Sequence, residues 1–243
     1  MKTYKQSKMS PLADSTQGRS LVVSGWGGDW KSDLGIESRN VMVFIKRLGR
    51  SVFTTHELRA ISGKSASTLI QCLNRLVGQG LLTKIYRGVW AEPRHKAISA
   101  FEMIPYLFPR QRAYVSFITA LHLYGILEQI PQMITLASPS HARIIRTRAG
   151  VFSVHQIAPA FFDGFGWYKG GGSFLIAEPE KALIDSLYLS SRKKKQYGHF
   201  PELYFPSEFS FKKAGDWVKH IREKKIRVYV LKKLDALREQ AQH

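Results

Sequence analysis

Apolar residues recur at helical spacing from about residue 40 onward. Residues 40–48 place Val, Phe, Ile and Leu side chains on one face and Lys46 and Arg47 on the other, which predicts a short amphipathic helix. Gly49 is expected to end this helix. The preceding residues, 1–37, mix polar residues and glycine without periodicity, and we interpret them as a flexible basic arm. Trp26 and Trp30 leave open a role for this arm in contacting phosphate or the minor groove.

Two further helices follow at short spacing. Thr54 and Glu57 stand three residues apart, as in a capping box, so a second helix is expected to begin at Thr54. Gly63 predicts a tight turn after it. A third helix is predicted from residue 65 or 66 to residue 77, and Gly78 and Gly80 are expected to terminate it.

The residues after the third helix predict a β-hairpin. Residues 81–86 and 89–91 are β-prone runs, and Arg87-Gly88 between them has the length of a two-residue hairpin turn. Helix, helix, glycine turn, helix and hairpin, in this order, are typical of a winged helix-turn-helix. The sequence therefore predicts a DNA-binding module of this type at residues 38–95.

The two faces of the third helix differ in chemistry. Leu69, Leu73 and Leu76 fall in one stripe that is expected to pack on the two earlier helices, with Cys72 buried beside it. The opposite face is polar and carries no acidic residue. The residues of this helix and its turn that are expected to contact DNA are Lys64, Ser65, Ser67, Thr68, Gln71, Asn74 and Arg75.

These residue types suit recognition of a DNA duplex. Gln and Asn pair with adenine and Arg with guanine in the major groove, whereas Lys64 near the turn is expected to meet phosphate. In the hairpin, Lys84, Tyr86 and Arg87 are expected to reach phosphate or the minor groove. A solvated polar face without a ligand is the alternative for the same pattern.

The larger remainder, residues 96–243, predicts a mixed domain. Residues 114–124 are expected to form a helix that Gly125 closes, and Pro179 is expected to open another that runs to residue 189. A basic amphipathic helix is expected near residues 231–239. Strands are expected at residues 133–137, 144–145, 152–157 and 173–176. The fold class is therefore α+β, an N-terminal winged helix-turn-helix followed by a larger mixed α/β C-terminal domain.

Charge narrows the class of partner. The chain of 243 residues has 37 Lys and Arg against 18 Asp and Glu, a net charge of +19, which favours a polyanion such as nucleic acid. The density is greatest from Arg39 to Glu92, where 9 basic residues face 2 acidic ones. No apolar run is long enough to span a membrane, the N-terminus does not have the pattern of a signal peptide, and the lone Cys72 fits a reducing compartment. We expect a cytoplasmic, nucleoid-associated bacterial protein without a membrane partner.

The sequence resembles the AbiEi-type antitoxins of type IV toxin–antitoxin and abortive-infection systems. The resemblance rests on the winged helix above, on residues 114–121 with Gly125, and on Ala177-Glu178-Pro179-Glu180-Lys181-Ala182-Leu183-Ile184-Asp185, which is similar to a PEKALLD-like signature of the family. It implies a transcriptional autorepressor that binds repeats in its own promoter and counteracts a nucleotidyltransferase-like toxin. Binding to inverted repeats implies dimerisation on DNA.

Two alternatives of other classes stay open. Glu178, Glu180, Lys181 and Asp185 invite comparison with a metal-dependent nuclease. However, Glu180 and Lys181 are adjacent and point apart on a helix, and Glu178 with Pro179 is explained by a helix start. A repressor with a ligand-sensing C-terminal domain is the other alternative. We predict no catalytic residue, metal ligand or cofactor, because the sequence has no HExxH, Walker or GxSxG motif.

Overall fold

The computed structural model describes residues 36–93, 98–109, 112–170, 174–192 and 202–241, with the backbone alone at residues 36–40. Residues 36–243 form one compact unit, and the predicted arm at residues 1–37 lies almost wholly outside the described residues. The division between residues 95 and 96 stays a prediction. None of the described helices is long and apolar enough to cross a membrane.

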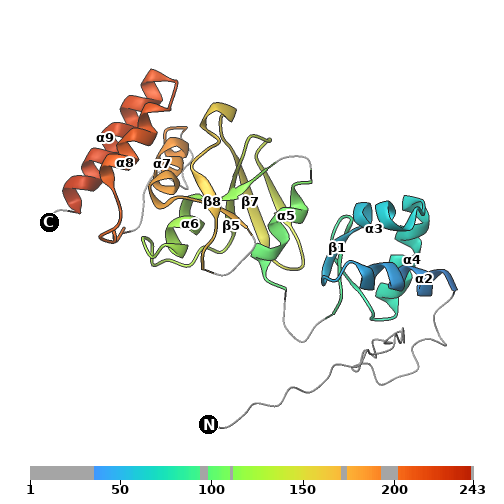
Figure 1. Cartoon of the computed structure of the whole chain (residues 1–243). Helices are drawn as coiled ribbons and strands as arrows, with labels where there is room; N and C mark the ends of the chain where they lie inside the picture. The colour runs from blue at the N-terminus through green and yellow to red at the C-terminus, as the bar shows by residue number, and fades with distance from the viewer. Residues whose placement is uncertain (1–35, 94–97, 110–111, 171–173, 193–201, 242–243) are drawn as a thin grey trace, which may run out of the picture. The chain divides into compact units, whose positions relative to one another are not determined.

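Three helices open the described chain, as the periodicity predicted (Figure 1). They are α2 (Ile36–Arg47), α3 (Thr55–Ser62) and α4 (Ala66–Gly78). The first begins four residues before the predicted start. Gly49 and Gly63 follow helix ends with φ of +64° and +67°, a left-handed conformation that glycine adopts without steric cost. The predicted terminators are therefore confirmed.

The hairpin belongs to a small antiparallel sheet. Strands β2 (Thr83–Tyr86) and β3 (Val89–Ala91) flank the predicted turn, in which Gly88 has φ of +72°. A third strand, β1 (Val52–Thr54), pairs with β3 to give the order β1-β3-β2. This strand was not predicted, because a run of three residues that ends in the helix cap is too short to show an alternating pattern.

The remainder of the chain is built on a six-stranded mixed sheet of order β6-β7-β5-β4-β9-β8. The strands are β4 (Tyr114–Val115), β5 (Ile134–Ser138), β6 (Arg143–Arg146), β7 (Val151–Gln156), β8 (Phe165–Trp167) and β9 (Leu175–Ala177). Pairs β5–β7 and β4–β9 are parallel and the other pairs are antiparallel. The α+β class and the four predicted strands are confirmed, with shifts at their ends. Strand β8 was not predicted.

One predicted helix is wrong at its start. Tyr114 and Val115 form the central strand β4, and α6 begins only at Phe117 and runs to Leu123. Both strand residues are fully buried, since they pair with β5 on one side and β9 on the other. Pairing on two sides outweighs the helical pattern of so short a run. Gly125 ends α6 with φ of +71°, as predicted.

The other helices cover the sheet. In Figure 1, α6 and α7 (Pro179–Ser190) lie on one side of the sheet, and α5 (Ile104–Leu107), preceded by a short 3-10 turn, lies on the other. The pair α8 (Phe211–Lys219) and α9 (Lys224–Gln240) packs on α7. The predicted helix starting at Pro179 is confirmed. The basic C-terminal helix is confirmed and is longer than predicted, and α8 was not predicted.

Candidate nucleic-acid interface

Local contacts fix the start of α4 and the helix before it. The side chain of Thr54 accepts a hydrogen bond from the Glu57 backbone at 3.1 Å, and the Glu57 carboxylate accepts one from the Thr54 backbone at 2.7 Å. This is the predicted capping box. At the next turn, the Ser65 hydroxyl accepts from the Thr68 backbone N–H at 3.2 Å and caps α4.

The inner face of α4 is the predicted leucine ridge. Leu69, Leu73 and Leu76 are fully buried, and Cys72 beside them is buried as well. The helix packs on α2 and α3, where Val41, Ile45 and Leu58 are also buried. Because this ridge fixes the rotation of α4 about its axis, it determines which side chains point outward.

The outer face of α4 is exposed and polar. Ser67, Gln71, Asn74 and Arg75 are exposed, while Lys64 and Thr68 are half-buried. The hydroxyl of Ser65 is exposed but is already engaged by the cap and by hydrogen bonds with Ser67 and Thr68 at 2.9 Å. An apolar side chain, Ile70, borders this face and is 42% exposed. The predicted residues of α4 therefore share one surface, in which Ser65 serves mainly the helix.

The wing is anchored to the helices. The indole N–H of Trp90 donates to Thr55 Oγ1 at 2.8 Å, and the Thr55 backbone donates to the carbonyl of Gly88 at 2.9 Å. Arg87 at the tip is exposed, and the Lys84 ammonium lies 5.2 Å from the centre of the Trp90 ring. Tyr86 is half-buried and packs against the hydrophobic core. Of the three predicted wing residues, Lys84 and Arg87 are free to reach a ligand.

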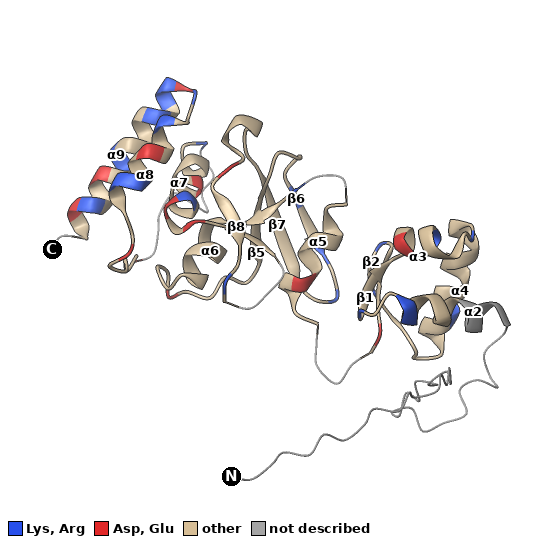
Figure 2. Cartoon of the chain, in the orientation of Figure 1, with Lys and Arg blue, Asp and Glu red and all other residues tan. Residues whose placement is uncertain are grey.

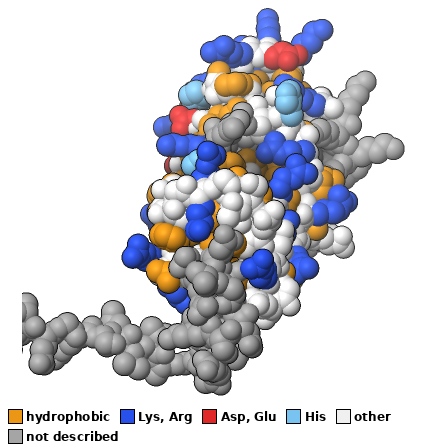
Figure 3. All heavy atoms as spheres, turned by 90° about the vertical axis from the view of Figure 1, so that its right-hand side faces the viewer, with side chains coloured by type: hydrophobic (Ala, Val, Ile, Leu, Met, Phe, Trp, Pro, Cys, Tyr) orange, Lys and Arg blue, Asp and Glu red, His pale blue; other side chains and the backbone are white. Residues whose placement is uncertain are grey.

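Acidic charge near this surface is neutralised. Glu57 and Glu92 are the only acidic residues between Arg39 and Pro93. Glu57 pairs with Arg50 at 2.5 Å and Glu92 with Lys46 at 2.9 Å. Figure 2 shows how few acidic residues lie on these elements, and the face drawn in Figure 3 carries many Lys and Arg side chains and few acidic ones. The exposed polar face of α4 and the wing together therefore present a positive surface.

Residues 42–93, from α2 to the end of the wing, match the family model described as a transcriptional regulator, AbiEi antitoxin. This segment, the AbiEi-type domain, is similar to that family. The resemblance stated from the sequence is thereby confirmed for the winged helix. None of the curated proteins compared with the chain matches it. The AbiEi-type domain includes every residue predicted to contact DNA, and the family description is that of a regulator.

The signature-like residues 177–185 lie outside the AbiEi-type domain and are buried in the other part. The Lys181 ammonium pairs with the Asp185 carboxylate one turn along α7, and both side chains are 0% exposed. Tyr114 and Ser116 donate hydroxyl hydrogen bonds to the same carboxylate at 3.0 and 2.7 Å. Burial raises the pKa of the Tyr114 hydroxyl well above its usual value, and the neighbouring Asp185 raises it further. Burial lowers the pKa of the Lys181 ammonium, and the negative charge of Asp185 opposes that shift. This cluster joins α7 to the sheet.

The acidic residues behind the nuclease alternative are thus in structural contacts. Glu178 and Glu180 both pair with Lys213 of α8, at 3.1 and 3.3 Å, and Asp185 is enclosed with Lys181. Within the described residues, no three His, Cys, Asp or Glu side chains gather as metal ligands. No observation on the described chain favours a nuclease.

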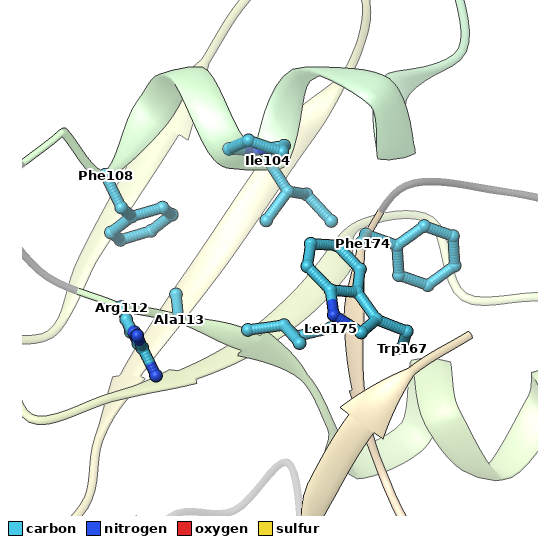
Figure 4. A pocket seen from close by; sticks show the side chains of 8 residues that line it. Ile104, Phe108, Arg112, Ala113, Trp167, Phe174 and Leu175 are labelled. Atoms are coloured by element: carbon cyan, nitrogen blue, oxygen red, sulfur yellow. The ribbon is translucent and has the colours of Figure 1, made fainter.

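A hollow on the larger part is apolar. It measures about 170 Å³ and lies between α5 and strands β8 and β9, where Ile104, Phe108, Phe174 and Leu175 line it (Figure 4). Trp167, which is 67% exposed, and Arg112 complete the rim. Ligand sites combine apolar walls with several polar groups that fix orientation. Among the described residues that line the hollow, Arg112 has the one charged side chain, so the hollow does not favour the ligand-sensing alternative.

Proposed function

We propose that the chain is a DNA-binding transcriptional autorepressor and antitoxin. The AbiEi-type domain binds duplex DNA, with α4 in the major groove and the wing on the adjacent backbone. The observation that carries this proposal is the exposed, acid-free face of α4 opposite a fully buried leucine ridge. The family of residues 42–93, described as a transcriptional regulator, supports it.

The polar side chains predicted to contact DNA have different roles in this proposal. Gln71, Asn74 and Arg75 read base edges, since amide and guanidinium groups form paired hydrogen bonds with adenine and guanine. Lys64, Lys84 and Arg87 bind phosphate and set the register. Of the remaining predicted contacts, Ser67 and Thr68 supply hydroxyl groups to the DNA backbone. Ser65 acts through the cap of α4, and Tyr86 is half-buried behind the wing tip.

A binding titration tests the DNA-reading surface. The probes are a duplex with the promoter sequence upstream of the gene and a scrambled duplex of the same length. Loss of a base contact in Gln71→Ala or Arg75→Ala is expected to weaken promoter binding by about 1 to 3 kcal/mol and to leave binding to the scrambled duplex less affected. Lys224→Ala, a change at an exposed position of α9, is the control. Unchanged promoter affinity in both α4 variants would remove the assignment.

The antitoxin role concerns the second partner. We infer that the chain counteracts a nucleotidyltransferase-like toxin, and the word antitoxin in the description of the matched family supports this inference. The toxin to test is a nucleotidyltransferase-like protein encoded beside the gene. Expression of this toxin alone is expected to stop growth, and co-expression of the chain is expected to restore it. If Arg75→Ala also restores growth when the toxin is expressed from an unrelated promoter, antitoxin activity is independent of DNA binding.

Binding to inverted repeats is the third element of the proposal. Two copies on one operator place the α4 helices of the pair one helical turn apart, about 34 Å, or a multiple of it. Footprinting is expected to show two protected half-sites at that spacing, and mass measurement of the complex two chains per duplex. One chain per protected promoter would contradict dimerisation on DNA.

A further inference from the structure

The edge strand β6 and the turn after it carry a row of arginines outside the AbiEi-type domain. Arg143 and Arg146 stand at the two ends of β6, and Arg148 follows in the turn to β7; all three are exposed. From residue 129 to residue 162 the sequence has no Asp or Glu. The positive charge of this edge is therefore not offset by neighbouring residues along the chain (Figure 2).

The three side chains are held differently. The Arg143 guanidinium donates to Ser140 Oγ at 3.1 Å and to the His141 carbonyl at 3.2 Å, and it lies 5.3 Å from the centre of the Phe108 ring. The side chains of Arg146 and Arg148 have no ion pair or hydrogen bond with the described residues. Two guanidinium groups thus stand ready for a ligand.

The turn that bears Arg148 touches the wing. The Arg148 backbone N–H donates to the carbonyl of Ile85 in β2 at 3.2 Å. Ile85 stands two residues before Arg87 of the wing tip, a distance of about 7 Å along a strand. The arginines of β6 and the cations of the wing therefore belong to neighbouring parts of one positive surface.

We propose that Arg146 and Arg148 form a second phosphate-binding surface, which contacts the sugar–phosphate backbone of the duplex beyond the wing. This inference rests on the proposed DNA binding by the AbiEi-type domain. Guanidinium groups bind phosphate through two parallel hydrogen bonds, and contacts to phosphate add affinity without reading sequence. The surface extends the bound stretch of DNA and leaves base selection to α4.

Charged residues on an edge strand have another common use, protection against pairing with strands of other molecules. The two uses respond differently to substitution. Protection requires a charge of either sign, so Arg146→Glu/Arg148→Glu would preserve it. Phosphate binding requires positive charge, so the same variant is expected to lose affinity for DNA without aggregating. Aggregation of Arg146→Gln/Arg148→Gln without loss of DNA affinity would favour protection and overturn the proposal.

The decisive measurement is fluorescence anisotropy of the promoter duplex and of a scrambled duplex. Arg146→Gln/Arg148→Gln is expected to raise both dissociation constants on the order of tenfold at about 0.1 M salt, and to reduce the slope of log K against log salt by about 2. The ratio between the two duplexes should stay constant. Arg146→Lys/Arg148→Lys keeps the charge and is expected to retain most of the affinity.

A matched control removes the same charge elsewhere. Lys232→Gln/Lys233→Gln neutralises two exposed cations of α9, and it is expected to change either dissociation constant less than twofold. Equal losses in the control and the arginine variant would mean that net charge alone matters, and would overturn the proposal. If the wild-type chain binds neither duplex, the proposed function fails too. If Arg75→Ala weakens promoter binding and the β6 variant does not, this inference alone fails.

Discussion

Lys181 is a fully buried cation, and its partners explain why the fold tolerates it. Its ammonium pairs with Asp185, donates to the Tyr114 hydroxyl at 3.1 Å and lies 3.9 Å from the centre of the Phe161 ring. Either charge alone would destabilise the folded state, because a buried charge needs a partner of opposite sign. The residue that looked like a nuclease lysine therefore belongs to the packing of α7 on the sheet.

Removing one member of this pair is expected to destabilise the protein severely. Lys181→Met leaves the Asp185 carboxylate buried and unpaired, which costs about 3 to 5 kcal/mol, whereas Lys181→Met/Asp185→Leu should recover much of that loss. Urea unfolding followed by circular dichroism measures both. Lys219→Met, which breaks an exposed pair with Asp216, is the comparison and is expected to leave the free energy of unfolding nearly unchanged. Equal costs for the two single variants would contradict the argument.

Tyr124 gives a prediction about alkaline pH. Its hydroxyl donates to the Ala177 carbonyl at 3.0 Å, and burial raises its pKa from 10.0 to about 12. The unfolded chain loses this proton first, so the stability that Tyr124 contributes is complete below about pH 10 and is lost as pH rises through about 12. Tyr124→Phe should therefore be less stable than wild type by about 1 kcal/mol at about pH 8. The difference measured by urea unfolding should shrink at about pH 11 to 12, and a constant difference would contradict this account.

At the scale of single elements, the capping box of α3 links sequence to geometry most directly. Thr54→Ala removes the acceptor of the Glu57 backbone N–H and is expected to cost about 0.5 to 2 kcal/mol in the free energy of unfolding. Thr54→Ser keeps a hydroxyl and should lose less than half of that. Chemical denaturation of the two variants compares them, and an equally large loss for serine would assign the effect to the methyl group of Thr54 instead of the cap.

Some elements could be predicted from the sequence and others could not. The cap at Thr54, the glycine at position 63 and the leucine ridge are local signals, since each acts within a turn or two of helix. Residues 114–115 form strand β4 because they pair with strands about 20 and 60 residues away along the chain, and no local sequence pattern indicates such pairing. Strands β1 and β8 were missed for the same reason: three residues acquire their conformation from pairing.

The candidate site shows the same division. The polar face of α4 follows from helical geometry alone, and the structure places all its predicted residues on or beside one surface. The sequence could not indicate that Ser65 is engaged in its own cap or that Tyr86 packs against the core. Nor could it relate Arg148 to the wing, because the contact with Ile85 joins segments more than 60 residues apart.

At the scale of the whole molecule, the number of phosphate contacts sets how DNA binding depends on salt. The proposed phosphate contacts involve about five cations, three on the turn and wing of the AbiEi-type domain and two on the β6 edge, and each contact releases counterions from the duplex. The slope of log K against log salt is expected to be about −4.5, with affinity falling by roughly 500-fold between about 0.05 and 0.2 M salt. Anisotropy titrations over that range measure the slope. A slope shallower than about −2 would count against a phosphate-dominated interface.

The position of the single cysteine has a practical consequence. Cys72 lies buried on the inner side of α4, and the 243 residues contain no other thiol. A thiol reagent can modify the chain only when the three-helix bundle opens, so the labelling rate reports the opening free energy of that bundle alone. Operator DNA bound to α4 should slow the labelling of Cys72, so this one thiol reports whether the helix is occupied by DNA.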